Sequence, residues 1–315
     1  MTRILISDAY AQEGLELLEN AGDVELVNQP GMSAEELLQV IDSFDGLGVR
    51  SATKVTPEVI AASKGRLKVV VRAGVGVDNI DLDAAAQAGV AVMNTPFGNT
   101  VSAAEHAVAL LMSVSRNIPQ ATSSMKAGRW DKKKLSGRQL TGRCAGVIGF
   151  GNIGKVVVDR LVGLRLKVLV SDPVASAEDV AALGAELVDL ETLLASADYV
   201  TLHVPLVPAT AHLINDQTLA QMKDDAFLIC AARGGVVDES ALLRCLESGR
   251  LSGAALDVFE QEPVAADSAL VAHPKVICSP HLGASTREAQ LQVSIDAADQ
   301  LLHFFRTGEP MNKVN

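Results

Sequence analysis

Short runs of Val, Ile and Leu alternate with helix-like stretches along the whole chain, and this alternation constrains the fold more than any other feature of the sequence. The runs are continuously apolar, as expected of parallel strands that are buried on both faces. Strands that alternate with helices in this way build α/β folds with parallel sheets. Because 48% of the residues are hydrophobic but only 3% are aromatic, the cores must consist mainly of aliphatic side chains. The predicted strands are 4–7, 24–27, 47–49, 67–71 and 90–93 in a first series, and 145–149, 167–171, 199–203, 227–231, 254–258 and 276–279 in a second.

A turn followed by a helix separates the two series of strands. Asn, Pro and Gly are concentrated in residues 94–99, which predicts the turn. Ser102 and Glu105 have the spacing of a capping box, which predicts a helix over 102–117. A chain of 315 residues is long enough for two domains, and we place the crossing between them near this helix. A last helix is predicted over 286–306.

The formal net charge of −11 bears on the kind of partner that the chain can bind. Nucleic acids are bound by basic surfaces, so no nucleic acid is expected as a partner. An anionic substrate would need a local basic pocket, because the overall field of the protein repels it.

Cysteine usage and the N-terminus bear on the cellular compartment. The first residues reach Asp8 before they form the apolar core of a signal peptide. The longest apolar run is shorter than the roughly 18 residues that a membrane span needs, so no membrane association is expected. The cysteines show neither C-x-x-C spacing nor clustering with His, which predicts reduced thiols in a cytoplasmic protein and no metal site. They are Cys144, Cys230, Cys245 and Cys278.

The strongest local motif is Gly149-Phe150-Gly151-Asn152-Ile153-Gly154, which has the form G-x-G-x-x-G. It follows an apolar strand and opens a helix, and the next predicted strand ends in Asp172. Glycines at these places permit a tight turn and let backbone N–H groups and a helix N-terminus approach a pyrophosphate. An acid about 20 residues further on accepts hydrogen bonds from ribose hydroxyls and repels a 2′-phosphate, which favours NAD over NADP. The alternative is a strand–helix turn that binds no ligand.

Arg233, Glu262 and His281 each follow a predicted strand of the second series. Ligands of open α/β sheets bind beyond the carboxyl ends of the strands, so these three side chains are expected to converge. Arg can bind a carboxylate through two hydrogen bonds, and His can exchange a proton with the oxygen of a hydroxyl or keto group. A carboxylate on the other ring nitrogen fixes the tautomer and favours imidazolium. Such a set suits hydride transfer to a keto acid; taken singly, the residues could be a surface ion pair, a loop carboxylate and a helix cap.

At these residues the chain resembles the D-isomer-specific 2-hydroxyacid dehydrogenase family, over essentially its full length. Residues 72–81 (RAGVGVDNID) and 233–239 (RGGVVDE) are typical of that family. The resemblance implies an α/β fold of two domains with parallel sheets, one Rossmann-like and one flavodoxin-like, with the active site in the cleft between them. It implies a discontinuous substrate-binding domain of residues 1–97 and 286–315, and an NAD-binding domain of residues 98–285.

The resemblance also implies roles for individual residues. Arg233, Glu262 and His281 stand at the positions of the family's catalytic triad. Contacts with the cofactor NAD are expected at Gly149, Gly151, Asn152, Ile153, Gly154, Asp172, Pro173, His203, Val204, Pro205, Ala231, Ala232, Arg233, Asp257, His281, Gly283 and Ala284. Contacts with the substrate are expected at Arg50, Ser51, Arg72, Gly74, Val75, Gly76, Asn99, Arg233 and His281.

Within the family the chain is most similar to the phosphoglycerate dehydrogenase branch. This resemblance implies reversible, NAD-dependent oxidation of 3-phospho-D-glycerate to 3-phosphohydroxypyruvate, the entry step of serine biosynthesis. A phosphorylated substrate would explain the presence of Arg50 and Arg72, since the guanidinium group matches the geometry of phosphate. The similarity lies in residues 49–56 (VRSATKVT), 93–96 (MNTP) with 98–100 (GNT), and 281–286 (HLGAST) with 288–290 (EAQ).

The branch also implies a homodimer or a larger homo-oligomer, joined through the nucleotide domain and residues 117–140. The lysines at 132–134 either add positive potential across such an interface or form a solvated arm. The chain differs from many relatives at Cys230, where they have Asn, which should affect strand packing more than chemistry. It ends at Asn315, before the serine-binding regulatory domain of longer members, which predicts no feedback inhibition through such a domain.

Other functions remain compatible with parts of the pattern. A glyoxylate or hydroxypyruvate reductase, or another D-2-hydroxyacid dehydrogenase, has the same triad. Formate dehydrogenases of the superfamily have Gln at the position of Glu262, so that activity is disfavoured. A more distant alternative is a dinucleotide-sensing corepressor that binds proteins, but the sequence shows no added peptide-binding tails, and the intact triad disfavours a pseudoenzyme.

Overall fold

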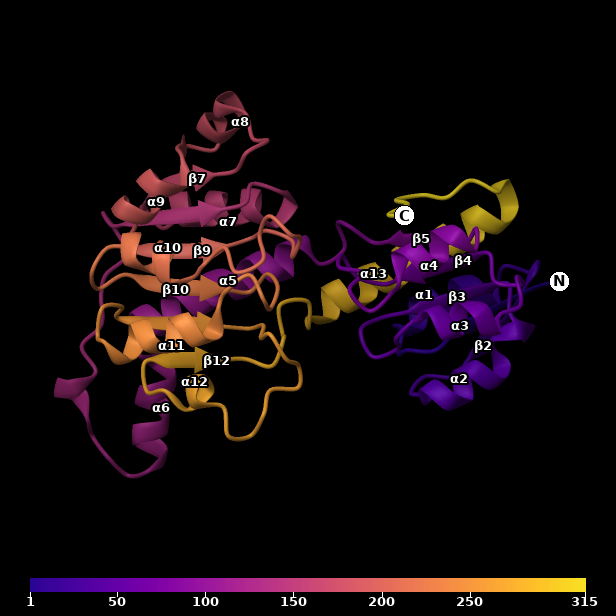
Figure 1. The fold of residues 1–315 in the computed structure, drawn as a ribbon, viewed down its shortest axis with the longest axis horizontal. Helices are drawn as coiled ribbons and strands as arrows, with labels where there is room; N and C mark the ends of the chain where they lie inside the picture. The colour runs from indigo at the N-terminus through magenta and orange to yellow at the C-terminus, as the bar shows by residue number, and fades with distance from the viewer. The chain divides into compact units, whose positions relative to one another are not determined.

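The computed structural model describes all 315 residues, which divide into two compact units (Figure 1). Unit 1 consists of Met1–Thr100 and Ala284–Asn315, and unit 2 consists of Val101–Gly283. The domain boundaries expected from the sequence, at 97/98 and 285/286, differ from these divisions by three residues or fewer. Ala284, which we predicted to contact the cofactor, is therefore the first residue of the second segment of unit 1.

Unit 1 contains a parallel sheet of five strands in the order β2-β1-β3-β4-β5. This is the flavodoxin-like order, in which the chain reverses direction across the sheet between β1 and β3. The strands are β1 (Thr2–Ile6), β2 (Val24–Asn28), β3 (Gly46–Val49), β4 (Val69–Arg72) and β5 (Ala91–Asn94). The helices are α1 (Gln12–Glu19), α2 (Ala34–Val40), the 3-10 helix η1 (Ile41–Ser43), α3 (Pro57–Ala62), α4 (Leu82–Gln87) and α13 (Arg287–Thr307).

Helices cover both faces of the unit 1 sheet, which explains why the inner strands β3 and β4 are almost wholly buried, whereas the edge strand β2 contains Glu25 and fully buries only Val24. On β1, Ile4 and Ile6 pack with α1 and α13, while Leu5 packs on the other face with α2, α3 and α4. The final helix α13 packs against α1 near the start of the chain. Its Ser294 hydroxyl accepts a hydrogen bond of 2.9 Å from the backbone N–H of Ala11. As predicted, α13 ends at Gly308, which has the left-handed backbone of a helix C-cap.

Unit 2 contains a parallel sheet of seven strands in the order β12-β11-β10-β9-β6-β7-β8. The strands are β6 (Cys144–Ile148), β7 (Lys167–Ser171), β8 (Glu186–Leu187), β9 (Tyr199–Leu202), β10 (Phe227–Cys230), β11 (Gly253–Leu256) and β12 (Val276–Cys278). The helices are α5 (Thr100–Ser115), whose first residue belongs to unit 1, α6 (Ile118–Lys126), the 3-10 helix η2 (Lys132–Lys134), α7 (Asn152–Gly163), α8 (Ala177–Ala182), α9 (Leu190–Ser196), α10 (Asp216–Gln221), α11 (Glu239–Glu247) and α12 (Ala269–Ala272).

Helices cover the unit 2 sheet on both faces (Figure 1). Buried side chains of α9, α10, α11 and α12 pack on one face, and those of α5, α7 and α8 pack on the other. The chain runs from β6 outward to β7 and β8, then returns to β9 on the other side of β6 and continues to β12. The point of reversal therefore lies between β6 and β9, where open α/β sheets bind their ligands.

Three local predictions differ from the structure. Helix α5 begins at Thr100 rather than at a Ser102 cap, because the N–H of Thr100 already closes a turn onto the carbonyl of Phe97. The polar segment after it contains a further helix, α6, whose first turn includes Pro119, a position where the missing N–H of proline is harmless. The two-residue strand β8 was not predicted, since it is too short to show a pattern.

None of the helices combines the length and the hydrophobicity needed to cross a membrane.

Candidate active site

The glycine motif forms the turn between β6 and α7. Gly149 has a φ of 98°, and a Cβ there would lie 2.5 Å from the carbonyl oxygen of His203. A Cβ on Gly154 would overlap the carbonyl oxygen of Gly149, so helix and turn pack too closely for any side chain. Gly151 differs from both, because it is exposed and no atom lies within 4 Å of a Cβ built there. The turn is thus closed toward the protein and open on the side where a pyrophosphate would approach the N-terminus of α7, at Asn152.

Asp172 follows β7 and lies beside the glycine turn. One carboxylate oxygen accepts a hydrogen bond of 2.7 Å from the N–H of Phe150, and the other accepts one of 2.9 Å from Val174. The side chain is half-buried, while Pro173 beside it is exposed. These contacts hold the carboxylate of Asp172 at the position where the G-x-G-x-x-G motif predicts an acceptor for the hydrogen bonds of ribose hydroxyls.

The segment His203-Val204-Pro205 follows β9, on the other side of β6. The Nε2 atom of His203 and the hydroxyl of Thr201 are 2.9 Å apart. Burial lowers the pKa of His203 from 6.5 to about 4, so the ring is neutral at physiological pH. His203 therefore supplies uncharged polar ring atoms at the point where the strand order reverses, between β6 and β9.

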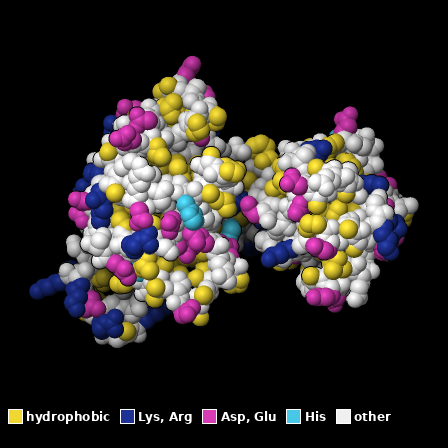
Figure 2. Space-filling model, in the orientation of Figure 1, with side chains coloured by type: hydrophobic (Ala, Val, Ile, Leu, Met, Phe, Trp, Pro, Cys, Tyr) yellow, Lys and Arg dark blue, Asp and Glu magenta, His cyan; other side chains and the backbone are white.

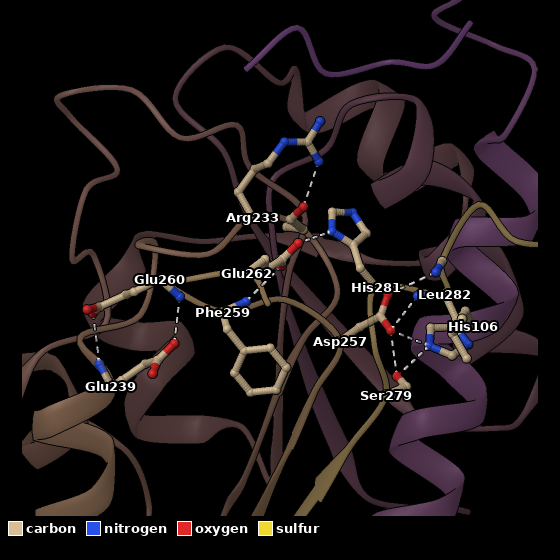
Figure 3. Close-up of polar contacts among 12 residues, drawn as sticks. His106, Arg233, Glu239, Asp257, Phe259, Glu260, Glu262, Ser279, His281 and Leu282 are labelled. Atoms are coloured by element: carbon tan, nitrogen blue, oxygen red, sulfur yellow. Dashed lines mark hydrogen bonds and ion pairs between the residues drawn. The ribbon is translucent and has the colours of Figure 1, made fainter. Parts of the chain in front are cut away.

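Glu262 and His281 are in direct contact beyond the ends of β11 and β12. The Nδ1 atom of His281 lies 2.7 Å from Oε2 of Glu262, as Figure 3 shows. The second oxygen of Glu262 accepts a hydrogen bond of 3.1 Å from the N–H of Phe259. Both side chains remain substantially exposed, 37% for Glu262 and 49% for His281, so a substrate can reach the imidazole. The carboxylate fixes the ring and leaves Nε2 available for proton exchange.

Arg233 follows β10, the strand next to β11, and lies in the same group of side chains (Figure 3). Its Nη1 donates a hydrogen bond of 2.6 Å to the carbonyl of Ala232. The next residue, Gly234, packs so closely against the carbonyl of Phe259 that a Cβ would overlap it. The loops that carry Arg233 and Glu262 are therefore held together by backbone contact.

Burial raises the pKa of the neighbouring Cys230 to about 11, so this thiol stays neutral and serves packing.

Asp257, at the end of β11, was predicted to contact the cofactor. Its side chain is 1% exposed, and both of its oxygens are occupied by donors of the protein. One oxygen accepts from Ser279 and the N–H of Leu282 and lies 3.1 Å from Nε2 of His106; the other accepts from the N–H of Gly283 (Figure 3). His106 is not among the site residues predicted from the sequence, although a polar residue beside the core positions of α5 is a visible signal.

In unit 1, Arg50 follows β3 on a loop that two polar side chains fix. Asp8, at the end of β1, accepts hydrogen bonds from the N–H groups of Arg50 at 2.5 Å and Thr53 at 3.1 Å. Asn79 donates to the carbonyls of the same two residues. The Nε atom of Arg50 is buried without a hydrogen-bond partner, and desolvation lowers the pKa of the guanidinium. An arginine in this state gains from an anionic ligand, whereas Ser51 beside it is exposed to solvent.

The other predicted substrate residues of unit 1 follow β4 and β5. A Cβ on Gly74 would lie 2.7 Å from Nη1 of Arg72, so the backbone of this loop lies against the guanidinium. Asn94 donates a hydrogen bond of 2.6 Å to the carbonyl of Val75. This bond helps to fix the loop that continues into Gly76. Asn99, after β5, has a buried Oδ1 without a partner. These residues, like Arg50, belong to the carboxyl-end loops of a parallel sheet.

Comparisons with known proteins identify the family. The family model of the D-isomer specific 2-hydroxyacid dehydrogenase NAD binding domain matches residues 108–283. The chain is 48% identical over 297 residues to D-3-phosphoglycerate dehydrogenase 2, chloroplastic, of Arabidopsis thaliana, an alignment that covers 94% of this chain and 47% of the relative. The chain thus spans about half the length of such curated relatives.

Solved structures show the same fold over the whole chain. A glyoxylate reductase from Paecilomyes thermophila has a TM-score of 0.90 at 28% identity, with 99% of this chain and 98% of that chain covered. The 3-phosphoglycerate dehydrogenase of Entamoeba histolytica, solved with bound NAD+, has a TM-score of 0.84 at 28% identity, with 100% and 98% covered. The glycine turn that is open at Gly151, with Asp172 beside it, fits the same cofactor. The chain therefore belongs to the D-isomer specific 2-hydroxyacid dehydrogenase family, and its unit 2 is the NAD binding domain of that family.

Proposed function

We propose that the chain catalyses the reversible oxidation of 3-phospho-D-glycerate at C2 to 3-phosphohydroxypyruvate with NAD. The observation that carries the proposal is the 2.7 Å contact between Glu262 and the imidazole of His281, beside Arg233, in an NAD binding domain. The similarity to curated phosphoglycerate dehydrogenases supports the choice of substrate. When bound, NAD accepts the hydride that leaves C2.

Each member of the group has a distinct role in this proposal. Nε2 of His281 accepts the proton of the C2 hydroxyl during oxidation and returns it during reduction, because Nδ1 is held by Glu262. Glu262 stabilises the imidazolium that forms and keeps the ring oriented. Arg233 binds the substrate carboxylate and polarises the adjacent carbonyl in the reverse direction.

Arg50 and Arg72 are the proposed ligands of the substrate phosphate. Arg50 has a buried Nε without a partner and a partly desolvated guanidinium whose Nη1 donates to the carbonyl of Ala9 at 3.1 Å, and the unpartnered Nε favours capture of an anion. Such local charge is needed because the chain as a whole carries a net charge of −11. The backbone of Gly74, Val75 and Gly76 is the proposed partner of the substrate carboxylate.

Steady-state oxidation of NADH with parallel substrates tests the proposal. Phosphohydroxypyruvate, hydroxypyruvate, glyoxylate and 2-oxoglutarate would be compared at one pH. We expect kcat/KM for phosphohydroxypyruvate to exceed that for hydroxypyruvate by about 100-fold, the value of a charge-assisted pair of roughly 2.7 kcal/mol. Arg50→Gln should remove most of this difference, while Arg66→Gln, which alters a surface ion pair with Asp45, should not. Equal kcat/KM with and without the phosphate would rule out the phosphoglycerate assignment.

A glyoxylate or hydroxypyruvate reductase is the second candidate. It is favoured by the TM-score of 0.90 with a glyoxylate reductase, and it uses the same acid–base pair. The substrate panel separates the two, because a reductase of this kind gains nothing from Arg50. A wild-type kcat/KM for glyoxylate at or above that for phosphohydroxypyruvate would favour it.

We also propose that the chain forms a homodimer or larger homo-oligomer through α6 and the segment that follows it. Ile118, Met125 and Trp130 are 52%, 56% and 78% exposed, a large apolar exposure for one short region. Lys and Arg side chains gather beside it on the face shown in Figure 2. Sedimentation should give at least twice the monomer mass, and Met125→Glu should reduce it while Leu38→Glu on α2 does not. A monomer at micromolar concentration would contradict the proposal.

A further inference from the structure

The carboxylate of Asp257 is the centre of a hydrogen-bond cluster that the proposed reaction does not use. Oδ1 accepts from the hydroxyl of Ser279 at 2.5 Å and the N–H of Leu282 at 2.8 Å, and it lies 3.1 Å from Nε2 of His106. Oδ2 accepts from the N–H of Gly283 at 2.9 Å. Burial raises the pKa of Asp257, but the hydrogen bonds from His106, Ser279 and Leu282 outweigh it and hold the pKa below its ordinary value. The group is therefore an anion that only accepts hydrogen bonds.

The charge of Asp257 determines the direction of the other bonds in the cluster. Ser279 gives its only hydroxyl proton to the carboxylate, so its oxygen must accept from Nε2 of His106, which lies 3.0 Å away. Nε2 of His106 therefore carries a proton that faces both Asp257 and Ser279. An apolar side chain at position 106 would remove this donor and leave a buried charge one hydrogen bond short.

The donors come from two segments that lie far apart in the sequence. His106 is on α5, five residues after the chain enters unit 2 at Val101. Leu282 and Gly283 are the last residues before the chain leaves that unit. A Cβ on Gly283 would lie 3.9 Å from that of Ala103, so helix and loop are also in packing contact. Asp257 thus holds both connecting segments of unit 2 at one place.

The same loop carries His281 in a conformation that is costly for a residue with a side chain. His281 has a φ of 53°, in the left-handed region that L-residues seldom adopt. Its N–H donates to the backbone carbonyl of Asp257 at 2.9 Å and to that of Ser279 at 3.0 Å. The loop does not form this conformation by local preference, so its neighbours must hold it.

We propose that His106 is a positioning residue that acts through Asp257 and Ser279 to hold the loop 279–283, and with it the imidazole of His281 against Glu262. The inference rests on the proposed function in that His281 is taken as the acid–base group. Misplacement of a reacting group by about 1 Å can cost two orders of magnitude in rate, so a loose loop lowers turnover without removing any group that touches the substrate.

Three variants test the role of His106. His106→Leu removes the donor, His106→Gln retains an amide N–H of similar reach, and Glu105→Gln is the matched control on the exposed side of the same helix. With NADH and the best oxo acid of the substrate panel, we expect kcat of His106→Leu to fall about tenfold. Its Kd for NADH, measured by fluorescence titration, should stay within about twofold, and His106→Gln should recover most of kcat. A kcat of His106→Leu equal to that of the control would overturn the proposal.

Hydrogen exchange provides a measurement that does not depend on activity. The amides of Leu282 and Gly283 donate to Asp257, so they should exchange faster in His106→Leu than in wild type, and His106→Gln should restore their protection. Unchanged exchange in His106→Leu would overturn the inference, even if kcat fell. If wild type reduced no oxo acid at all, the proposed function would fail, while the exchange result would still decide whether His106 orders the loop.

A double-mutant cycle tests whether His106 acts through Asp257. In the Asp257→Asn background, His106→Leu should cause little further loss of kcat, because the link to the loop is already broken. Additive losses in the double variant would show that His106 acts by another route and would overturn the proposal.

Discussion

The imidazole ring of His281 contacts one carboxylate, and the 2.7 Å contact of Nδ1 with Glu262 leaves Nε2 as the other ring nitrogen. Replacing His281 with Gln removes the proposed proton carrier but leaves the glycine turn after β6 unchanged. We expect kcat to fall by about 10²- to 10⁴-fold, the usual contribution of a general acid–base group. The Kd for NADH, measured by fluorescence titration, should stay close to that of wild type. Near-normal turnover of this variant would exclude the acid–base assignment.

A second residue, His203, should make stability depend on pH. Burial lowers its pKa to about 4 in the folded protein, whereas an unfolded histidine titrates near 6.5. As the pH falls from about 6.5 to 4, the unfolded chain binds a proton that the folded protein does not, so the free energy of unfolding decreases. Because the side chain is partly exposed, we expect a loss of about 1–2 kcal/mol across this window. Urea unfolding at pH 7 and pH 4.5 should show this loss in wild type; a His203→Gln variant with the same loss would contradict the assignment.

At the scale of elements, the turn between β6 and α7 distinguishes glycines needed for packing from a glycine left open to a ligand. Gly151 has an ordinary φ of −73° and free space around an added Cβ, so Gly151→Ala should keep the wild-type melting temperature. It should nevertheless weaken NADH binding by about tenfold, or roughly 1.4 kcal/mol, because the methyl group occupies the surface that a pyrophosphate approaches.

Gly154→Ala is the matched comparison for Gly151→Ala. Its methyl group would overlap the carbonyl of Gly149, so helix α7 must shift away from the strand. We expect a loss of about 1–3 kcal/mol in stability, as for other overpacked sites, visible as a lower melting temperature without any ligand. The assignment of this turn would be wrong if Gly154→Ala were as stable as wild type, or if Gly151→Ala bound NADH normally.

At the scale of the whole molecule, the two units have separate cores on both faces of separate sheets. Binding of NADH to unit 2 should therefore protect the amides of that unit more than those of unit 1. At a ligand concentration of about 100 times Kd, the expected stabilisation is roughly 2.7 kcal/mol. Hydrogen exchange followed by mass spectrometry, with and without NADH, measures it for each unit. Equal protection of both units would show that they unfold as one cooperative body.

Much of this architecture follows from local patterns in the sequence. The apolar runs correctly predicted parallel sheets with both faces buried. The apolar residues of a buried strand are neighbours in the sequence, so the pattern can be recognised without knowing the tertiary structure. The glycine motif between a strand and a helix predicted the NAD binding domain, since the turn permits only glycine at 149 and 154. The rule that side chains at the carboxyl ends of strands converge correctly predicted that Glu262 and His281 lie together.

Tertiary structure alone decided which residues surround those side chains. His106 and Asp257 are 151 positions apart and meet only because α5 packs against the loop after β12. Asp8 and Asn79, which hold the Arg50 loop, likewise come from other segments, the loops that follow β1 and β4. A motif records the residues that the chemistry or the backbone requires at one place, whereas a buried carboxylate can take its donors from any segment that the fold brings within hydrogen-bond distance. The sequence by itself therefore determined the sheets and the glycine turn and brought Glu262 and His281 to neighbouring strand ends, and the packing of the helices and loops on those sheets decided what holds these two side chains in position.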